Sequence, residues 1–233
     1  MLVSIVITSD SDPEVVRLFL DAVKNISYFP DALMLQVVVV DDLGVLDEGF
    51  CSGYRCSFDL VLMGGGDRHG QLAALVKGVA RADGEVVVTM DPDMHRNVAD
   101  IKRFVAEYQR GYHLVFAWRV RRRGVPGIRI ALTAVFNAMA RIIGDMALRD
   151  FNTSMILLSR QAVDMLKTMP AEACSARLYM LHMMAGDVTE VQIETEELPG
   201  RKSTYSRSGR ILIFVERLME VIRFRIYRHK TQA

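Results

Sequence analysis

The amino-acid sequence predicts one α/β domain built on an open, mostly parallel β-sheet. Apolar runs of strand length alternate with stretches of helical periodicity along the amino-terminal half of the chain. Several of these runs end in carboxylates, and ligands of such sheets bind beyond the carboxyl ends of the strands. The chain has 233 residues, which is enough for one buried core, and nothing in it looks like a linker or a repeat.

The first elements follow from uninterrupted apolar runs, which indicate strands that are buried on both faces. Asp12 and Pro13 predict the start of a helix, because Asp caps a helix and Pro fits its first position. Residues 70–82 keep helical spacing and predict a second helix. The predicted strands of this half are residues 2–8, 35–42, 60–63 and 85–91.

The second half continues the alternation of helices and strands. We expect one domain over residues 1–208 and a basic, amphipathic helix appended over residues 209–233, with its helical core at about 209–228. Between residue 91 and this tail, the sequence predicts a helix at about 97–110, a strand at 113–118 followed by the arginine cluster 119–123, a long helix at about 126–147, and strands at 153–159 and 188–195 with short helices between them.

The composition is that of a globular protein, with 51% apolar and 24% charged residues. We expect no signal peptide, because no basic segment precedes the first apolar run. No run of about 18 apolar residues lacks a charge, so we expect no segment to span a bilayer. The three cysteines lack the spacing of metal ligands and suit a reducing cytoplasm.

Charge is divided unevenly along the chain. From residue 201 onward there are nine Lys and Arg against two Glu, giving +7, so residues 1–200 carry −6 of the total of +1. A basic tail on an acidic body indicates an anionic partner for the tail. The tail helix either lies in the headgroup region of an anionic membrane or docks on the domain or on a second subunit. Nucleic acid is not an expected partner, because the body is acidic and no stacking motif is present.

Asp91 and Asp93 are the strongest candidates for a metal site. They stand two residues apart just after a buried strand, with Pro92 stiffening the turn between them. Mg²⁺ or Mn²⁺ prefers one or two carboxylates together with diphosphate oxygens and water. The alternative interpretation is a solvated turn. The place at the end of a predicted buried strand favours the metal site.

The stretch GQLAALVKGVARADGEVVVTMDPD (70–93) resembles glycosyltransferase family 2, especially the dolichyl- and polyprenyl-phosphate sugar synthases. That family carries a helix of the form G-x-x-x-A-x-x-x-G-x-x-x-A-x-G, then a strand and D-A-D-x-Q. The resemblance implies a GT-A fold and a metal-diphosphate site at Asp91 and Asp93. His95 stands where the family has Gln, and it is expected to be either a third metal ligand through a ring nitrogen or a surface residue. The matching residues are Gly70, Ala74, Gly78, Ala82, Gly84, Asp91 and Asp93.

Later segments extend the resemblance. Arg119 stands where the family has an arginine among phosphate-facing groups, and residues 148–166 are similar to D-x-x-S-G-F-x-L-x-x-R through Asp150 and Arg160. Residues 201–207 resemble the loop R-x-x-G-x-S-K, which closes over the donor diphosphate and the acceptor phosphate in relatives. In this loop the resemblance implies phosphate-binding roles for Arg201, Ser206 and Arg207.

The nucleoside end departs from the family pattern. The motif I-P-x-Y-N-E is missing after the first strand, whereas D-D-G-S is represented by Asp41-Asp42-Leu43-Gly44. One of the two carboxylates, Asp41 or Asp42, is expected to hold the nucleoside. Because of this departure, the sequence does not identify the base of the nucleotide. A non-catalytic binding module with a decayed site remains an alternative interpretation of the chain.

The expected function is an inverting, metal-dependent transfer of a sugar from a UDP- or GDP-sugar to a polyprenyl phosphate at the cytoplasmic face of the membrane. Residues 170–185 lack the acid pair that would deprotonate a sugar hydroxyl, and a phosphate acceptor needs no such base. A saccharide hydroxyl remains the alternative acceptor, and an oligomer is possible. The expected site comprises Asp93, Arg119, Arg201 and Arg207 in catalysis, Asp41, Asp42, Asp91 and Ser206 in donor binding, and Asp91, Asp93 and His95 on Mg²⁺ or Mn²⁺.

Overall fold

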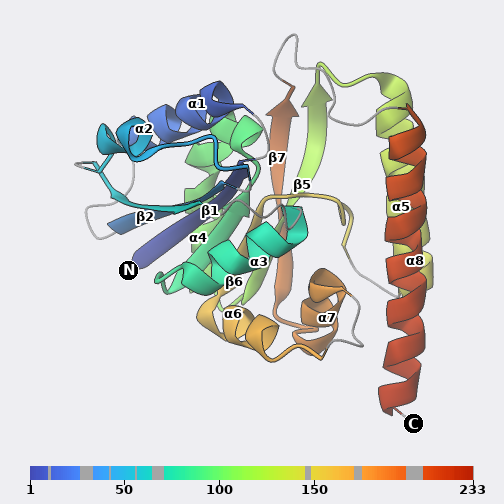
Figure 1. The fold of residues 1–233 in the computed structure, drawn as a ribbon. Helices are drawn as coiled ribbons and strands as arrows, with labels where there is room; N and C mark the ends of the chain where they lie inside the picture. Colours follow the sequence, from blue (N-terminus) through green and yellow to red (C-terminus); the bar gives the residue numbers. More distant parts are fainter. Residues whose placement is uncertain are drawn as a thin grey trace.

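A seven-stranded mixed sheet forms the centre of the molecule, with helices on both of its faces (Figure 1). The computed structural model describes residues 1–9, 12–26, 34–41, 43–55, 57–64, 71–144, 148–170, 175–197 and 207–232. The strands lie in the order β3-β2-β1-β4-β6-β5-β7. They are β1 (Leu2–Ser9), β2 (Met34–Asp41), β3 (Asp59–Gly64), β4 (Val86–Met90), β5 (Leu114–Arg123), β6 (Ile156–Ser159) and β7 (Val188–Glu196).

Strand direction sets the edge at which the site forms. Strands β1 to β4 pair in parallel, so their carboxyl ends share one edge of the sheet. Strand β6 runs antiparallel to both β4 and β5, which places its first residues at that same edge. Strand β7 is parallel to β5. The predicted α/β sheet is confirmed, and the ends of β4 and β5 meet the beginning of β6.

Two apolar cores lie on opposite faces of the sheet, because each buried strand sends alternate side chains to each face. In β1, Ile5 and Ile7 belong to one core and Val6 to the other. The first core packs against α1 (Pro13–Lys24), α2 (Glu48–Ser52), the 3₁₀ helix η1 (Pro92–Asp100) and α4 (Ile101–Gln109). The second packs against α3 (Gln71–Arg81), α5 (Gly127–Gly144), α6 (Arg160–Lys167), α7 (Ala176–Met183) and α8 (Arg207–Gln232).

Two glycines allow α3 and the turn after it to approach the sheet closely. A Cβ on Gly78 would lie 2.5 Å from Val6 Cγ1 and 2.8 Å from Val40 Cγ2. A Cβ on Gly84 would lie 2.6 Å from the backbone nitrogen of Ser4. Gly78 and Gly84 of the quoted motif therefore serve packing of α3 and the following turn on β1 and β2.

Most element boundaries agree with the sequence predictions to within two residues, but three elements near the site differ. The strand expected from residue 153 begins at Ile156. The helix expected from residue 97 begins at Pro92 as a 3₁₀ helix, so Asp91 is its N-cap residue and Asp93 lies in its first turn. The strand expected to end at residue 118 continues through Arg123, with an irregularity between Arg119 and Arg121. Pairing with β7 extends it, and both Arg121 and Arg123 form ion pairs with Glu194 there. The short helix α2 was not predicted.

Helices α5 and α8 form a two-helix layer at one side of the molecule (Figure 1). Phe214 packs edge-to-face on Phe136, and the Arg225 guanidinium donates a hydrogen bond of 2.8 Å to the carbonyl of Ile143. From the first contact to the second the chain advances along both helices, so the two helices run in the same direction. Helix α5 is long and apolar enough to cross a membrane by length and composition alone, and 22% of it is buried in the structure.

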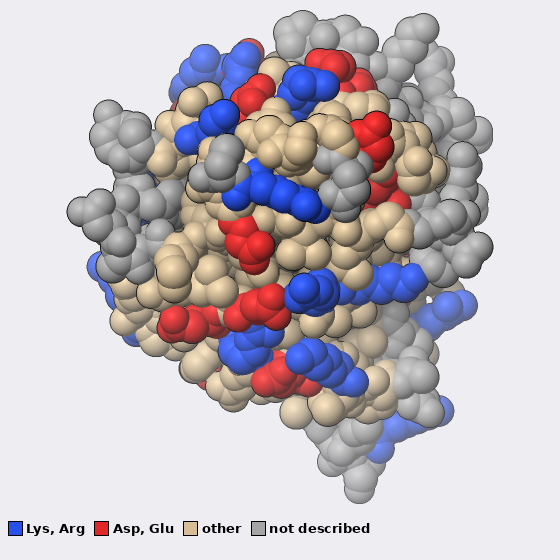
Figure 2. Space-filling model, turned by 60° about the vertical axis from the view of Figure 1, so that its left-hand side comes forward, with Lys and Arg blue, Asp and Glu red and all other residues tan. Residues whose placement is uncertain are grey.

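The opposite side of the molecule has a mixed surface. Figure 2 looks toward the side of Figure 1 on which α1 and α2 lie, and it shows basic and acidic side chains interspersed. Neither sign of charge dominates that face.

Candidate functional site

Asp41, Asp91 and Arg119 all stand at the carboxyl edge of the sheet, in agreement with the sequence prediction. Asp41 ends β2 and pairs with Ser9 at the end of β1. Asp91 follows β4 directly, and Arg119 lies in the second half of β5. The hydroxyl of Thr89 donates a hydrogen bond of 2.8 Å to the carbonyl of Ser154, which fixes the segment before β6 beside the end of β4. Residues far apart in the chain therefore meet at one edge.

The carboxylate of Asp41 is engaged in shaping the loop after β2. The side chain is buried, and its two oxygens accept hydrogen bonds from the backbone N–H groups of Leu43 at 3.3 Å and Leu46 at 2.6 Å. Such bonds are typical of Asp at turns. A nucleoside-binding role for this side chain stays a prediction. Its neighbour Asp42 lies outside the described residues.

A pocket of about 170 Å³ opens beside Asp91. The end of β1, the segment before β6, α7 and α8 all contribute to its wall. Among the described side chains that line it, Asp91 is the one carboxylate, whereas two guanidinium groups and several hydroxyls are present. The lining residues are Thr8, Leu75, Met90, Asp91, Phe151, Asn152, Thr153, Ser154, Ser175, Arg177 and Arg217.

Asp93 and His95 occupy different positions around η1. Asp93 lies in the first turn, two residues after Asp91. His95 lines a separate pocket formed with Ala22, Asn25 and other residues on the α1 side of the sheet. Burial, followed by the positive charge of Arg96, lowers the pKa of His95. The structure, which describes all three residues, does not bring His95 together with Asp91 and Asp93 as a three-ligand metal site, so the expected third ligand is not found there.

The carboxylates at this edge fit a divalent cation that arrives with a diphosphate. Asp91 and Asp93 supply two carboxylates, and phosphate oxygens and water would complete the coordination of Mg²⁺ or Mn²⁺. The described part of the chain contains no group of three or more acidic, His or Cys side chains placed to hold a metal by themselves. The buried hydroxyl of Ser9, at the end of β1, has no hydrogen-bond partner among the described residues. This unsatisfied group is available to a ligand at the same edge.

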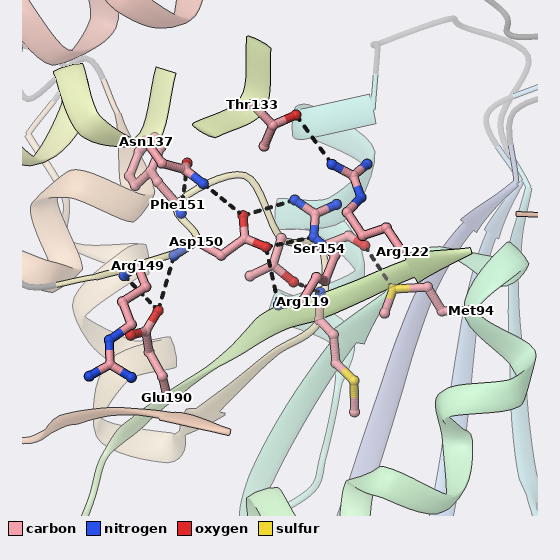
Figure 3. A network of polar contacts seen from close by, with 12 residues as sticks. Met94, Arg119, Arg122, Thr133, Asn137, Arg149, Asp150, Phe151, Ser154 and Glu190 are labelled. Atoms are coloured by element: carbon pink, nitrogen blue, oxygen red, sulfur yellow. Dashed lines mark hydrogen bonds and ion pairs between the residues drawn. The ribbon is translucent and has the colours of Figure 1, made fainter. Parts of the chain in front are cut away.

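Arg119 forms a bidentate ion pair with Asp150 beside this pocket (Figure 3). The Nε–Oδ2 distance is 2.7 Å and the Nη2–Oδ1 distance is 2.9 Å. Both side chains are largely buried. Burial by itself would raise the pKa of Asp150, but the hydrogen bonds and charge of Arg119 lower it below its usual value. The pair holds the guanidinium plane in one orientation, and a direct phosphate contact by Arg119 stays a prediction.

Two further residues hold Asp150 in place (Figure 3). Glu190 accepts hydrogen bonds from the backbone N–H groups of Arg149 and Asp150, at 2.8 and 3.1 Å. Asn137 on α5 donates to Asp150 at 3.4 Å, and its carbonyl oxygen accepts from the backbone N–H of Phe151 at 3.3 Å. The loop before β6 is thus tied to β7 and α5, which fixes the boundary between the Asp91 pocket and its neighbour.

That neighbour is a pocket of about 310 Å³ between β5 and α5. Of the described residues, four arginines line it, and its one lining carboxylate, Asp150, is already paired with Arg119. We call it the arginine pocket. Ile130 and Ala134 add an apolar wall from α5. The lining residues are Trp118, Arg119, Arg122, Ile130, Thr133, Ala134, Asn137, Arg141, Arg149 and Asp150.

Arg122 is one of the arginines that give the arginine pocket a positive electrostatic potential. Burial, followed by the charge of Arg119, lowers its pKa. Its guanidinium donates a hydrogen bond of 3.2 Å to the Thr133 hydroxyl on α5 (Figure 3). Arg149 stacks on the ring of Trp118 at 4.3 Å. An excess of arginine over carboxylate in one pocket favours an anionic ligand.

Several expected site residues lie outside the described part of the chain. Asp42, Arg201 and Ser206 belong to this group. Arg207 begins α8, and its side chain is not described. Arg160, quoted for its match to the family motif, donates to the carbonyl of Ala82 at 3.0 Å and so anchors α6 to the turn before β4.

Sequence reasoning missed the contributions of Arg141, Arg149, Arg177 and Arg217 to the two pockets. Arg141 and Arg217 lie on helices with ordinary amphipathic spacing, where a solvated position is the usual interpretation. An excess of arginine over acid was visible in the tail, but its connection to Asp91 depends on the path of α8. Only the folded chain brings α8 to that pocket.

The fold and the carboxylates that follow β4 are those of a GT-A protein. The sequence profile of glycosyl transferase family 2 matches residues 4–166. The chain belongs to this family. It is 30% identical over 169 residues to CsbB of Bacillus subtilis, whose name assigns it to the glycosyltransferases; the match covers 71% of this chain and 50% of CsbB.

A second relative and a solved structure extend the comparison. The chain is 26% identical over 201 residues to undecaprenyl-phosphate 4-deoxy-4-formamido-L-arabinose transferase of Pseudomonas fluorescens, which covers 84% of this chain and 57% of that protein. The structure of glucosyl-3-phosphoglycerate synthase from Mycobacterium tuberculosis with Mn²⁺, UDP-glucose and phosphoglyceric acid superposes with a TM-score of 0.64 at 15% identity, over 96% of this chain and 79% of that one. This likeness shows the fold. The chain spans 50% and 57% of the lengths of the two curated relatives.

Proposed function

We propose that this protein is an inverting glycosyltransferase that moves a sugar from a nucleoside-diphosphate sugar to a polyprenyl phosphate. The observation that carries the proposal is the arginine pocket beside the Asp91 pocket, separated from it by Asp150 and Phe151. A donor diphosphate bound at Asp91 and an acceptor phosphate bound among the arginines would meet at the sheet edge. The named activity of the relative from Pseudomonas fluorescens, transfer onto undecaprenyl phosphate, fits this arrangement.

The chemistry of the acceptor favours phosphate over a sugar hydroxyl. A hydroxyl nucleophile needs a base to remove its proton, whereas a phosphate oxygen is already anionic. The side chains that line the two pockets include the carboxylates Asp91 and Asp150, the first proposed for the metal and the second paired with Arg119. Arginines therefore bind and orient the acceptor in the proposed reaction, and no proton has to be removed from it.

The donor end is proposed to use the carboxylates that follow β2 and β4. Asp91 and Asp93 would hold Mg²⁺ or Mn²⁺, and Asp41 or Asp42 the nucleoside. The bound metal would act as a Lewis acid that stabilises negative charge on the departing diphosphate. Arg201, Ser206 and Arg207, in the segment 201–207, are proposed to hold phosphate oxygens. The synthase from Mycobacterium tuberculosis, which shares the fold, was crystallised with Mn²⁺ and UDP-glucose, and this supports a metal-dependent nucleotide-sugar donor.

A lipid acceptor also fits the surface of the α5–α8 layer. On α5, exposed apolar residues recur at Ile128, Leu132, Val135 and Ile142, on the side opposite to the buried Ala140. Helix α8 repeats the pattern with Val215, Met219 and Ile226. We call these seven exposed residues the apolar face. Arg141, Arg223 and Arg225 are exposed on the same two helices, so we propose peripheral contact with an anionic membrane on the cytoplasmic side.

The proposal is tested by offering radiolabelled UDP- and GDP-sugars together with a short-chain polyprenyl phosphate and Mn²⁺. Label is expected in a butanol-extractable lipid. Label in a water-soluble glycan would instead identify a saccharide hydroxyl as the acceptor. Calorimetry that detects no metal-dependent binding of UDP or GDP would identify a non-catalytic module.

Replacement of Asp93 by Asn tests the proposed metal site. The variant is expected to lose transfer completely and to keep the wild-type unfolding curve, because Asp93 is partly exposed at the start of η1. Asp164→Asn is the matched control, since Asp164 is an exposed carboxylate in an i,i+3 pair with Lys167. An undiminished rate in the Asp93 variant would contradict the assignment.

A further inference from the structure

Two arginines from the carboxyl-terminal part of the chain line the pocket that contains Asp91. Arg177 comes from the first turn of α7, and Arg217 lies in the middle of α8. Neither lies in the segment 201–207 that the sequence singled out for phosphate binding. They share the pocket with hydroxyls of Thr8, Thr153 and Ser175.

The contacts of Arg177 leave its positive charge without a partner carboxylate among the described residues. Its guanidinium donates a short hydrogen bond to the carbonyl oxygen of Phe151 and lies 5.3 Å from the centre of that ring. Burial, followed by the positive charges of Arg217 and Arg119, lowers the pKa of Arg177 to about 10, so it remains a cation at neutral pH. Arg119 and Arg217 are each paired with a carboxylate, so the positive charge in the pocket that a bound anion would offset is that of Arg177.

Arg217 has a carboxylate partner that it can exchange. Its Nη1 lies 3.1 and 3.3 Å from the two carboxylate oxygens of Glu220, one turn further along α8. Both side chains are partly exposed, and such i,i+3 pairs contribute only a few tenths of a kcal/mol in water. A more highly charged anion in the pocket would therefore compete successfully for this guanidinium.

We infer that Arg177 and Arg217 form a phosphate-binding subsite in the Asp91 pocket that holds the diphosphate of the donor. This inference rests on the proposed function. We assign the subsite to the donor and not to the acceptor, because the two arginines share their pocket with Asp91, the proposed ligand of the metal that accompanies the diphosphate. The acceptor phosphate has its own arginines on the other side of Asp150. The subsite makes α8 part of the reaction pocket, so that the carboxyl-terminal helix contributes to donor binding as well as to the surface.

Isothermal calorimetry with pyrophosphate, UDP and GDP tests the subsite, with and without Mn²⁺. Arg217→Gln is expected to weaken the binding of pyrophosphate by about tenfold or more, with or without Mn²⁺, because a charge-assisted contact is lost. The same loss is expected for whichever of UDP and GDP the wild type binds. Arg217→Lys, which keeps the charge, is expected to recover part of the affinity. Arg103→Gln, which removes the arginine of a comparable i,i+3 pair with Asp100 on the other face of the sheet, is the matched control and should leave binding unchanged.

A short polyprenyl phosphate distinguishes the two sources of phosphate. Its affinity is expected to be the same in wild type and in Arg217→Gln. A loss of affinity for this ligand alone would overturn the assignment to the donor, and wild-type affinity for all ligands in Arg217→Gln would overturn the subsite. A third outcome separates the subsite from the proposed function. If the wild type binds pyrophosphate but neither UDP nor GDP, and Arg217→Gln no longer binds pyrophosphate, the nucleotide donor is wrong and the phosphate-binding subsite is correct.

Arg177→Lys, which preserves the charge beside Phe151, is the second variant. We expect it to raise the KM for the donor and to leave the unfolding midpoint unchanged.

Discussion

At the scale of single residues, the ion pair between Arg119 and Asp150 governs how the two pockets are separated. Asp150 is 4% exposed, and it is held by the guanidinium, by Asn137 and by its own backbone contact with Glu190. The sequence analysis assigned Asp150 to a family motif and Arg119 to a set of phosphate-facing groups, and it did not predict a contact between the two residues. The structure joins them, which shows that part of the motif maintains the shape of the site.

Asp150→Asn is expected to destabilise the protein by about 3–5 kcal/mol at neutral pH, because it leaves the charge of Arg119 buried without its partner. The measurement is urea unfolding. Asp164→Asn, which breaks an exposed pair with Lys167, is expected to cost less than about 1 kcal/mol. Similar losses in the two variants would contradict the structural importance of the buried pair.

The same pair predicts a pH dependence. Because the folded-state pKa of Asp150 is lowered, its carboxylate stabilises the fold above the unfolded-state pKa of about 3.9. This contribution is lost as the pH falls through the lower folded-state pKa. The difference in unfolding free energy between wild type and Asp150→Asn should therefore narrow as the pH is lowered from about 6 to about 3. A difference that stays constant over this range would exclude the ion pair as its source.

At the scale of elements, the packing of α3 on β1 and β2 depends on the absence of a side chain at Gly78. Gly78→Ala adds a methyl group only 2.5 Å from Val6 Cγ1. Overpacking of this kind costs about 1–3 kcal/mol, which outweighs the gain in helix propensity of up to about 1 kcal/mol. Chemical denaturation measures the loss. Gly53→Ala is the control, since Gly53 has a φ of −70° and open space around it, and a loss of equal size there would rule out the contact with Val6 as the cause.

Helices and strands with a strong local sequence pattern could be predicted from the sequence. Those whose extent depends on pairing with a distant strand could not. Asp12 accepts a hydrogen bond of 3.0 Å from the backbone N–H of Glu14, so the predicted start of α1 is confirmed by its own cap. In contrast, the arginine-rich half of β5 has no apolar alternation, and it is a strand because β7 lies beside it. The early start of η1 likewise belongs to the turn after β4, where Pro92 can follow Asp91 into a helical conformation.

At the scale of the whole molecule, the apolar face of α5 and α8 predicts membrane binding. The double variant Leu132→Glu, Ile142→Glu places two charges on this face at positions that are 54% and 77% exposed, so the fold should persist. Flotation with vesicles that contain anionic phospholipid is expected to fall at least severalfold. Binding of the wild type should also weaken as salt is raised, because the arginines exposed on the same two helices contribute electrostatically.

Met34→Glu is the control for this experiment, because Met34 is 64% exposed at the start of β2 and lies outside the apolar face. It should float like the wild type. Equal flotation of all three proteins would show that α5 and α8 do not form the contact. Assembly of the wild type into a dimer that the double variant cannot form would assign the face to a second copy of the chain.

Local sequence patterns were sufficient for the α/β class, for the strands with continuous apolar runs, and for the placement of Asp41 and Asp91 at one sheet edge. These features follow from local periodicity and from the rule that parallel strands end together. The folded chain was needed to show that Arg119 pairs with Asp150, that His95 faces α1, and that Arg177 and Arg217 line the pocket of Asp91. The reason is physical: such contacts join residues separated by tens of positions in the chain, and their geometry depends on how helices pack across the sheet, which no local pattern encodes.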